Sequence, residues 1–206
     1  MKNIINPSKV IVLLTLIISG CSNITQVKNT RYNSINTFNN KGIQSPYECE
    51  YNQNSKGNGS FYKTDGPLEI PYNLISLEPT PIYEPLNKGT SRPYTILDQN
   101  FTPLLKLGNY KQIGVGTWYG RRYHGKKTAN GETYDMFQMT AASPILPIPS
   151  YAKVTNLNNG RSVTVRINDR GPFLKGRIID LSFMAACRLG YASKGSANVE
   201  VVSILP

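Results

Sequence analysis

The chain has 206 residues and a formal net charge of +11, from 23 Lys and Arg residues against 12 Asp and Glu residues. A charged fraction of 17% excludes a highly charged disordered chain and a coiled coil. Three cysteines are too few for a disulfide scaffold or a zinc knuckle, and a single histidine excludes a multi-histidine metal site. The positive excess indicates an acidic partner, and nucleic acid, anionic lipid and acidic polysaccharide all remain open.

The first twenty residues have the order of a bacterial lipoprotein signal peptide. Two lysines precede the apolar run Val10–Ile18, which is too short to span a bilayer but suits a signal peptide. The run ends in the lipobox-like sequence ISGC at residues 18–21, and Cys21 would be lipidated after cleavage. An ordinary signal peptide or a short membrane anchor is the alternative. We expect a signal peptide over residues 1–20 and a protein anchored in the cell envelope, where Ser22 favours the periplasmic face of the outer membrane.

Residues 21–110 are expected to form a lipid-anchored tether. The stretch from Ser22 to Gly59 is rich in Asn, Ser, Thr and Lys, and it buries too little apolar surface to offset its ordering entropy. Eight prolines between Pro46 and Pro103 favour extended polyproline II structure. Some apolar residues would instead pack on the following domain or bind a partner: Tyr72, Leu74, Ile75, Leu77, Ile82 and Leu86.

Two cysteines remain beside the one in the lipobox. Cys49 and Cys187 can pair in an oxidising compartment and close a long loop, or they can stay separate thiols with Cys187 buried on a helix face. The spacing of the cysteines does not decide between these arrangements.

Residues 111–206 are predicted to form the folded domain, because turn signals alternate there with short runs typical of strands. In Arg161–Ile167, apolar and polar residues alternate, which places the apolar ones on one face. A hairpin turn is predicted before this run at Asn158–Gly160, because Asn and Gly tolerate positive φ. The six expected strands are Ile113–Tyr119, Phe137–Ala142, Tyr151–Leu157, Arg161–Ile167, Arg177–Leu181 and Val199–Leu205.

One short helix is expected between the last two strands. Ser182 is suited to cap the N-terminus of a helix over Phe183–Leu189, and Gly190 is suited to follow its C-terminus. Six short strands and one helix predict a mainly β fold, a small closed barrel.

Four motifs in this domain together resemble those of the rare lipoprotein A (RlpA) family. They are GTWYG at 116–120, HGKKTANGETYD at 124–135, NDRGPF at 168–173 and RIIDLS at 177–182. The resemblance covers about residues 113–204 and implies a six-stranded double-psi β-barrel, similar in fold to expansins. It also implies an endolytic transglycosylase that acts on peptidoglycan strands lacking stem peptides. The C-terminal SPOR domain of many members is expected to be absent.

The resemblance implies that Asp169 and Glu132 carry the chemistry. The site must protonate the leaving oxygen and accept a proton from the muramic acid 6-hydroxyl, which a carboxyl group of raised pKa can do in turn. Asp169 follows a predicted strand that breaks into a Gly-Pro turn, and a turn-stabilising aspartate is the alternative. Asp180 and Asp135 are expected to make structural hydrogen bonds. We expect no cofactor and no metal.

One departure from the family pattern lies at Ser143. Active members carry a histidine after the Thr-Ala-Ala stretch, here residues 140–142, and serine can bind a sugar or a carboxylate but cannot titrate near neutral pH. His124, the one histidine, lies in another motif and is expected to be a loop or sugar-contacting residue. A non-catalytic, expansin-like peptidoglycan-binding lipoprotein is therefore the alternative function, and a structural tether through residues 60–110 is a third.

Aromatic and basic side chains are expected to bind glycan strands. Trp118, Tyr119 and Tyr134 can stack on pyranose rings, although Trp118 would equally suit the core. Arg170 and neighbouring basic residues would pair with lactyl carboxylates, and a solvated charged face is the alternative. The stretch 111–206 holds 13 Lys and Arg residues against 5 Asp and Glu residues, so most of the positive excess lies on the barrel. We expect no nucleic-acid partner, since no recognition motif is present.

Overall fold

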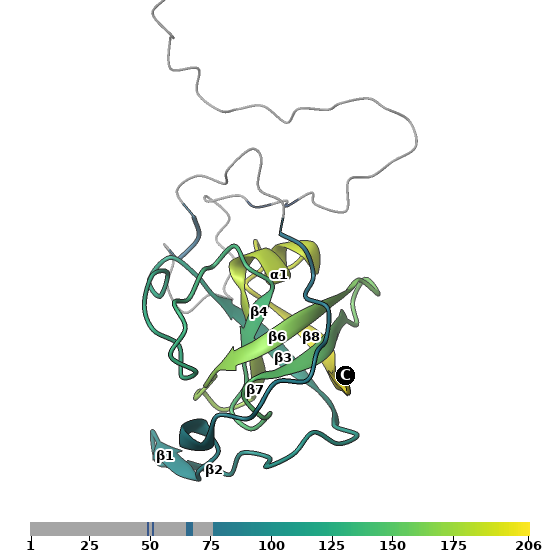
Figure 1. Cartoon of the computed structure of the whole chain (residues 1–206). Coiled ribbons are helices and arrows are strands. Elements are labelled where there is room, and N and C mark those ends of the chain that lie inside the picture. The colour runs from purple at the N-terminus through teal and green to yellow at the C-terminus, as the bar shows by residue number, and fades with distance from the viewer. Residues whose placement is uncertain (1–48, 50, 52–64, 68–75) are drawn as a thin grey trace, which may run out of the picture. The chain divides into compact units, whose positions relative to one another are not determined.

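The computed structural model describes residues 49, 51, 65–67 and 76–206 (Figure 1). The expected signal peptide, the lipidation site at Cys21 and most of the Asn-rich stretch lie outside the described residues. Within the described part, no helix has the length and apolar composition needed to cross a membrane.

Six strands close into a barrel, which confirms the expected mainly β fold. The strands are β3 (Lys111–Tyr119), β4 (Thr140–Ala142), β5 (Ser150–Asn156), β6 (Ser162–Asp169), β7 (Arg177–Ser182) and β8 (Ser196–Ile204). They pair around the barrel in the order β3-β7-β4-β6-β5-β8. The pairs β3–β7 and β4–β6 are parallel, and the other four are antiparallel.

Alternate residues of the strands fill the barrel interior. In β6, Val163, Val165 and Ile167 are buried, while Thr164 and Arg166 between them are partly exposed, as the sequence alternation predicts. Even-numbered residues of β6 therefore point away from the interior, toward the segments that pack on the outside of the barrel.

The strand expected over Phe137–Ala142 is shorter in the structure, where β4 has three residues. Asp135 explains the difference. Its carboxylate accepts a hydrogen bond from the Phe137 N–H (3.0 Å), and its carbonyl accepts one from the Gln138 N–H (3.1 Å). These bonds hold residues 135–138 in a turn, so strand pairing begins only at Thr140.

The expected helix is α1 (Phe183–Arg188), which lies across one end of the barrel (Figure 1). Ser182 caps it by accepting a hydrogen bond from the Ala185 N–H (3.2 Å), and Gly190 follows its C-terminus with a φ of 75°, as predicted. Cys187 lies on the buried face of α1 and forms a disulfide with Cys49, with 4.9 Å between the Cα atoms. The cysteines are therefore paired.

Residues 76–110 pack against the barrel, and we call this segment the strap. Its backbone is tied to the loop between β4 and β5, because the N–H groups of Asn87 and Leu104 donate to the Ile148 and Ile145 carbonyls, both at 2.8 Å. The packed structure therefore begins well before residue 111. The elements of the strap are η1 (Lys88–Thr90), β1 (Tyr94–Ile96) and β2 (Gln99–Phe101), and the two strands form a hairpin.

Polar contacts, rather than the apolar residues expected to anchor it, hold the first part of the strap. Leu77 and Ile82 are 69% and 57% exposed. Glu84, in contrast, forms an ion pair with Arg166 of β6, with 2.7 Å between the charged atoms. The strap is thus fixed by charge and hydrogen bonding at positions that hydrophobic patterning does not reveal.

Asp65 fixes a still earlier part of the chain to the loop that follows β3. Its carboxylate accepts hydrogen bonds from the N–H groups of Gly120 (3.0 Å) and Arg122 (2.8 Å), and its carbonyl accepts one from the Arg121 N–H (2.7 Å). The side chain is buried, so its two oxygens act as a cap for this loop.

Candidate functional site

A cavity of about 350 Å³ lies where β6 ends, and Asp169 lines it. The cavity is walled by residues from five parts of the chain, so it exists only in the folded barrel with the strap in place. Apart from Asp169, it is lined by Asp65, Leu97, Trp118, Tyr119, Tyr123, Ala142, Arg170, Gly171, Pro172, Phe173, Leu174, Arg177 and Asp180.

The Asp169 carboxyl group is held by backbone N–H groups and is partly buried. Its Oδ1 accepts hydrogen bonds from the N–H groups of Ala129 (2.7 Å) and Arg170 (2.8 Å). Burial raises the pKa of Asp169, although these two hydrogen bonds and the charge of Arg170 oppose the shift. Because both N–H groups bind Oδ1, the proton of the neutral acid belongs on Oδ2. Asp169 therefore suits a general acid.

Asp180 of β7 shares this cavity with Asp169. Its carboxylate accepts a hydrogen bond from the Thr117 hydroxyl, and Arg177 lies close enough to favour its charged form. Burial nevertheless raises its pKa, and the charge of Asp169 adds to that effect. The sequence interpretation gave Asp180 a structural role, which the Thr117 contact supports, but it did not anticipate a second acid beside Asp169.

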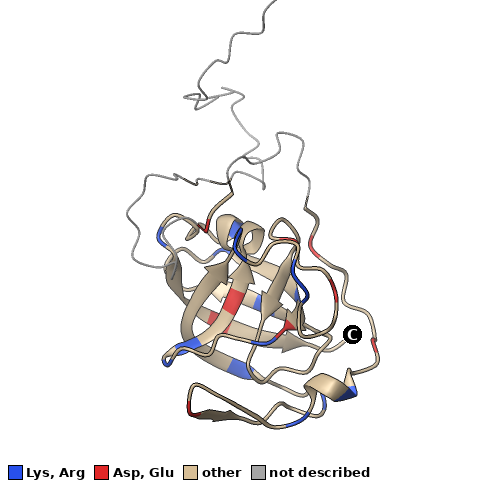
Figure 2. Ribbon diagram, turned by 90° about the vertical axis from the view of Figure 1, so that its left-hand side faces the viewer, with Lys and Arg blue, Asp and Glu red and all other residues tan. Residues whose placement is uncertain are grey.

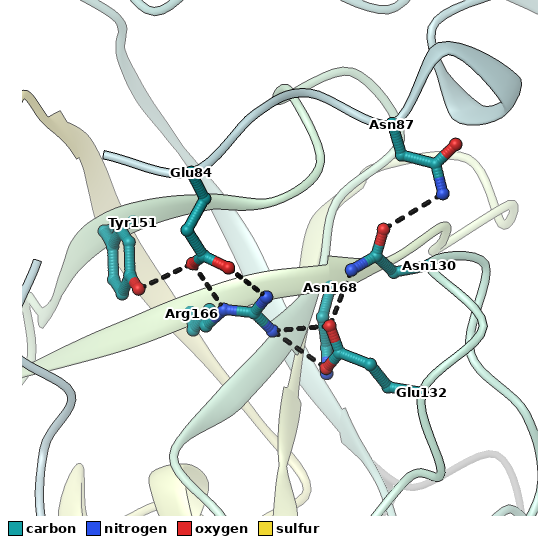
Figure 3. Close-up of polar contacts among 7 residues, drawn as sticks. All are labelled: Glu84, Asn87, Asn130, Glu132, Tyr151, Arg166 and Asn168. Carbon is teal, nitrogen blue, oxygen red and sulfur yellow. Dashed lines mark hydrogen bonds and ion pairs between the residues drawn. The ribbon is translucent and has the colours of Figure 1, made fainter. Parts of the chain in front are cut away.

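Glu132 lies in different surroundings, shown in Figure 3. Its carboxylate accepts hydrogen bonds from Asn130 Nδ2 (2.6 Å), from Asn168 Nδ2 (2.9 Å) and from Arg166 Nη1, which lies 2.8 Å from both oxygens. Partial burial favours the neutral acid, but these contacts outweigh it and hold the pKa of Glu132 below its ordinary value. Glu132 is therefore a carboxylate at neutral pH and suits a base or a charge stabiliser.

The two carboxyl groups lie on opposite sides of β6. Asn168 and Asp169 are consecutive, and while Asn168 binds Glu132, Asp169 lines the first cavity. Glu132 lines a second cavity, of about 440 Å³, together with Arg166 and Asn168. The loop before Glu132 joins the two sides, because Ala129 binds Asp169.

The three aromatic residues expected to stack on sugars are buried. Trp118, Tyr119 and Tyr134 are 5%, 8% and 2% exposed. Trp118 donates its indole N–H to the Ala192 carbonyl (3.0 Å), while Tyr134 stacks on Tyr119 with 4.1 Å between ring centroids. Trp118 and Tyr119 still line the Asp169 cavity. Tyr134 has a place in the core and no free face, so we do not carry it into the proposed site.

Ser143 and Arg170 also have their polar groups turned toward the backbone. Ser143 is 1% exposed, and its hydroxyl accepts a hydrogen bond from the Leu146 N–H (3.1 Å). The Arg170 guanidinium donates to the carbonyls of Ser143 (2.9 Å), Leu146 (2.7 Å) and Thr90 (2.8 Å). In this arrangement Ser143 does not face a sugar, and Arg170 clamps the strap to the barrel at the edge of the cavity.

His124 is held in its own loop. Its Nδ1 accepts a hydrogen bond from the Met136 N–H (3.2 Å) and lies 3.5 Å from an oxygen of Asp135. It does not contribute to the lining of the Asp169 cavity. Among the described residues, no group of three or more His, Cys, Asp or Glu side chains could hold a metal ion.

Lys and Arg residues are spread over several elements of the barrel rather than gathered on one (Figure 2). The positive excess found in the sequence therefore acts as a general field over the barrel and does not mark a single binding patch. The sequence interpretation also missed Asp65 and Leu97 as walls of the cavity. No sequence signal was available for them, since both lie in the stretch whose composition predicts a tether.

Comparisons with known proteins agree with the motifs. The lytic transglycolase family matches residues 111–201. The endolytic peptidoglycan transglycosylase RlpA of Pseudomonas aeruginosa is 54% identical over 116 residues, which cover 56% of this chain and 34% of that protein. RlpA of Vibrio cholerae is 48% identical over 138 residues, covering 66% of this chain and 52% of that protein.

The chain thus spans about a third to a half of the length of these curated relatives. Both matches are longer than the stretch from Lys111 to the C-terminus, so they must include part of the strap. Among solved structures, an expansin from Clavibacter michiganensis has a TM-score of 0.37 at 19% identity, covering 47% of this chain and 51% of that one.

Proposed function

We propose that the protein is a member of the RlpA family, to whose named proteins its barrel is similar, and that it is an endolytic lytic transglycosylase of peptidoglycan. The proposal rests on the similarity of the barrel and strap to RlpA proteins named for that activity. The observation that carries it is the Asp169 carboxyl group, which lies partly buried at the edge of a cavity and has a raised pKa.

In the proposed reaction, the β-1,4 bond between N-acetylmuramic acid and N-acetylglucosamine is cleaved without water. The bond from C1 of muramic acid to the leaving O4 breaks, and the muramic acid 6-hydroxyl forms a new bond to C1. Asp169 donates a proton to O4 and then accepts the proton of the 6-hydroxyl, which restores the acid. Glu132, held ionised on the other side of β6, contributes its negative charge to the field at this site, which favours positive charge developing at the sugar ring.

The test uses purified protein in which Cys21→Ala prevents lipidation. It is incubated with glycan strands stripped of stem peptides by an amidase, and mass spectrometry is used to detect 1,6-anhydromuramic acid ends. We expect product from the wild-type site and a loss of at least about a hundredfold in Asp169→Asn. We also propose a preference for bare strands, so intact strands with stem peptides should be cleaved more slowly.

A non-catalytic, expansin-like peptidoglycan-binding lipoprotein is the second candidate function. Ser143 favours it, because a buried serine stands where active members have a titratable histidine. Strands that bind to the protein in a pull-down assay but yield no anhydro ends would establish this second function and exclude the first.

We also propose that Cys21 carries a lipid and anchors the protein to the outer membrane. The support is the order of lysines, apolar run and lipobox in the sequence. Metabolic labelling with radioactive palmitate should label the wild type and leave Cys21→Ala unlabelled. Label retained in Cys21→Ala would remove the proposed anchor.

A further inference from the structure

The strap reaches the carboxylate of Glu132 by two separate routes. We propose that Glu84 and Asn87 of the strap are positioning residues, which fix the Glu132 carboxylate through Arg166 and through Asn130. This inference rests on the proposed function, in which the charge of Glu132 acts from the other side of β6 than Asp169. The strap would then hold the Glu132 carboxylate in place, in addition to packing on the barrel.

The first route runs from Glu84 through Arg166. Glu84 accepts hydrogen bonds from Arg166 on both oxygens, Oε1 from Nε (2.8 Å) and Oε2 from Nη2 (2.7 Å). The Tyr151 hydroxyl donates to Oε1 as well (2.7 Å), which fixes Glu84 from β5. The remaining nitrogen of the guanidinium, Nη1, then points at Glu132 (Figure 3). Because the planar guanidinium group is held along one edge, its other edge has a fixed direction.

The second route runs from Asn87 through Asn130 and carries no charge. Asn87 Nδ2 donates to Asn130 Oδ1 (3.1 Å), and Asn130 Nδ2 donates to Glu132 Oε1 (2.6 Å). Asn87 is itself fixed by its backbone bond to Ile148 (2.8 Å). The contact with Asn87 sets which end of the Asn130 amide faces Glu132, and so it orients the Nδ2 donor. Because Asn87 is neutral, it brings no charge of its own to the Glu132 carboxylate.

A positioning role and a simple charge effect predict opposite shifts at Glu132. Removing the negative charge of Glu84 from a site with Arg166 unmoved would make ionisation of Glu132 easier and lower its pKa. Releasing Arg166 and Asn130 would instead weaken the hydrogen bonds that keep Glu132 ionised, and its pKa would rise. The other charged groups at this cavity are Asp135 and Glu78, which the variants below leave in place except as a control.

Glu78 provides a matched control on the same strap. Its carboxylate accepts a hydrogen bond from the Thr164 N–H (2.7 Å) and pairs with Arg188 (3.7 Å), and it lines the same cavity as Glu132. Glu78→Ala therefore removes a strap carboxylate and a contact with β6 without touching either route to Glu132.

The experiment titrates Glu132 in the full chain by carbon-13 NMR of labelled glutamate carboxyls, with its signal assigned by its loss in Glu132→Gln. We expect the Glu132 pKa to rise in both Glu84→Ala and Asn87→Ala, and not to rise in Glu78→Ala. An unchanged or lower pKa in the first two variants would overturn the proposal. A rise of the Glu132 pKa in only one of the two variants would overturn the two-route arrangement. Only the route removed in that variant would then position Glu132.

Asn87→Ala keeps the test decisive if Glu84→Ala does not fold, because it removes one neutral side chain at a partly exposed position. A second readout uses bare glycan strands. We expect kcat to fall about tenfold in each variant while KM changes less than about twofold, and no further loss when Glu84→Ala is added to Glu132→Gln. Absence of anhydro product from the wild type would contradict the proposed function, while the titration, made without substrate, would still decide the positioning role.

Discussion

Asp169 and Glu132 are the carboxyl groups on which the proposed activity depends, and their surroundings act on them in opposite directions. Burial raises the pKa of Asp169, while hydrogen bonds from Asn168, Arg166 and Asn130 lower that of Glu132. One group is therefore suited to give a proton and the other to stay charged. Enzymes that need an acid and a base at one pH commonly separate two carboxyl groups in this way.

The raised pKa of Asp169 makes it a source of instability at neutral pH. The pKa of Asp169 is higher in the folded protein than in the unfolded chain. The stability that the neutral acid contributes is therefore fully present below the unfolded-state pKa and is lost as the pH rises through the folded-state pKa. Asp169→Asn cannot ionise and should keep that contribution. We expect its melting temperature to exceed that of the wild type by about 2 °C at pH 7, and the gap to narrow toward pH 4.

Thermal unfolding at the two pH values checks this prediction. If the melting temperature of Asp169→Asn at pH 7 is equal to or below that of the wild type, ionised Asp169 does not destabilise the fold and the prediction is wrong.

Leu97, at the tip of the hairpin formed by β1 and β2, is an exposed leucine in the left-handed conformation. Its φ is 49°, and its side chain is 66% exposed, so little packing compensates the backbone strain. Asn tolerates this conformation better than Leu. Leu97→Asn should therefore stabilise the protein by about 0.5–1 kcal/mol and, since Leu97 lines the Asp169 cavity, should also weaken glycan binding.

Leu105→Asn is the matched control for this prediction, because Leu105 is equally exposed and has a negative φ. It should not stabilise the protein. Denaturant unfolding and a glycan pull-down measure the two effects of Leu97→Asn. Unchanged glycan binding would show that the cavity wall at Leu97 is not used by the substrate.

At the scale of elements, regular patterns in the sequence predicted the barrel well. The alternation in Arg161–Ile167 and the Asn-Gly turn before it appear as β6 and its hairpin with β5. These signals are local, since each comes from a few neighbouring residues. The turn at Asp135 shortened β4 because a side-chain hydrogen bond competed with strand pairing, and apolar content alone does not reveal such a bond.

The strap was not predicted, and its contacts explain why. Glu84 and Asn87 bind residues that lie 82 and 43 positions away in the chain, and each contact depends on one polar side chain. No periodicity marks such positions. The same reason hid the surroundings of Glu132. The motif pointed to this loop residue, but its partner Arg166 comes from β6 and is oriented by Glu84 of the strap.

Ser182 allows a test of how far the helix α1 depends on its cap. Its buried hydroxyl accepts the Ala185 N–H, which would otherwise lack a partner at the helix N-terminus. Ser182→Ala should therefore destabilise the protein by about 1–2 kcal/mol. Chemical denaturation measures the change, and Ser162→Ala, at an exposed serine where β6 begins, should lie within about 0.5 kcal/mol of wild type. Equal effects of the two substitutions would contradict the capping role.

At the scale of the whole molecule, the Cys49–Cys187 disulfide joins an early segment of the chain to α1. It links residues 138 positions apart, and a link over so long a loop restricts the unfolded chain strongly. Cys49→Ser should lower the free energy of unfolding by about 2–5 kcal/mol. Urea unfolding in a Cys21→Ala background measures this loss, and reduction of the parent by a thiol should reproduce it. A reduced parent as stable as the oxidised one would contradict the prediction.

The disulfide and the barrel also impose an order of events during synthesis. Cys49 is made 138 residues before its partner Cys187. Likewise β3, the first barrel strand, pairs with β8, the last. Neither closure can occur until these later residues have been made, so Cys49 passes through that part of synthesis as an unpaired thiol beside strands with open edges. Any cell that makes this protein must keep that thiol from the wrong partner until Cys187 has been made.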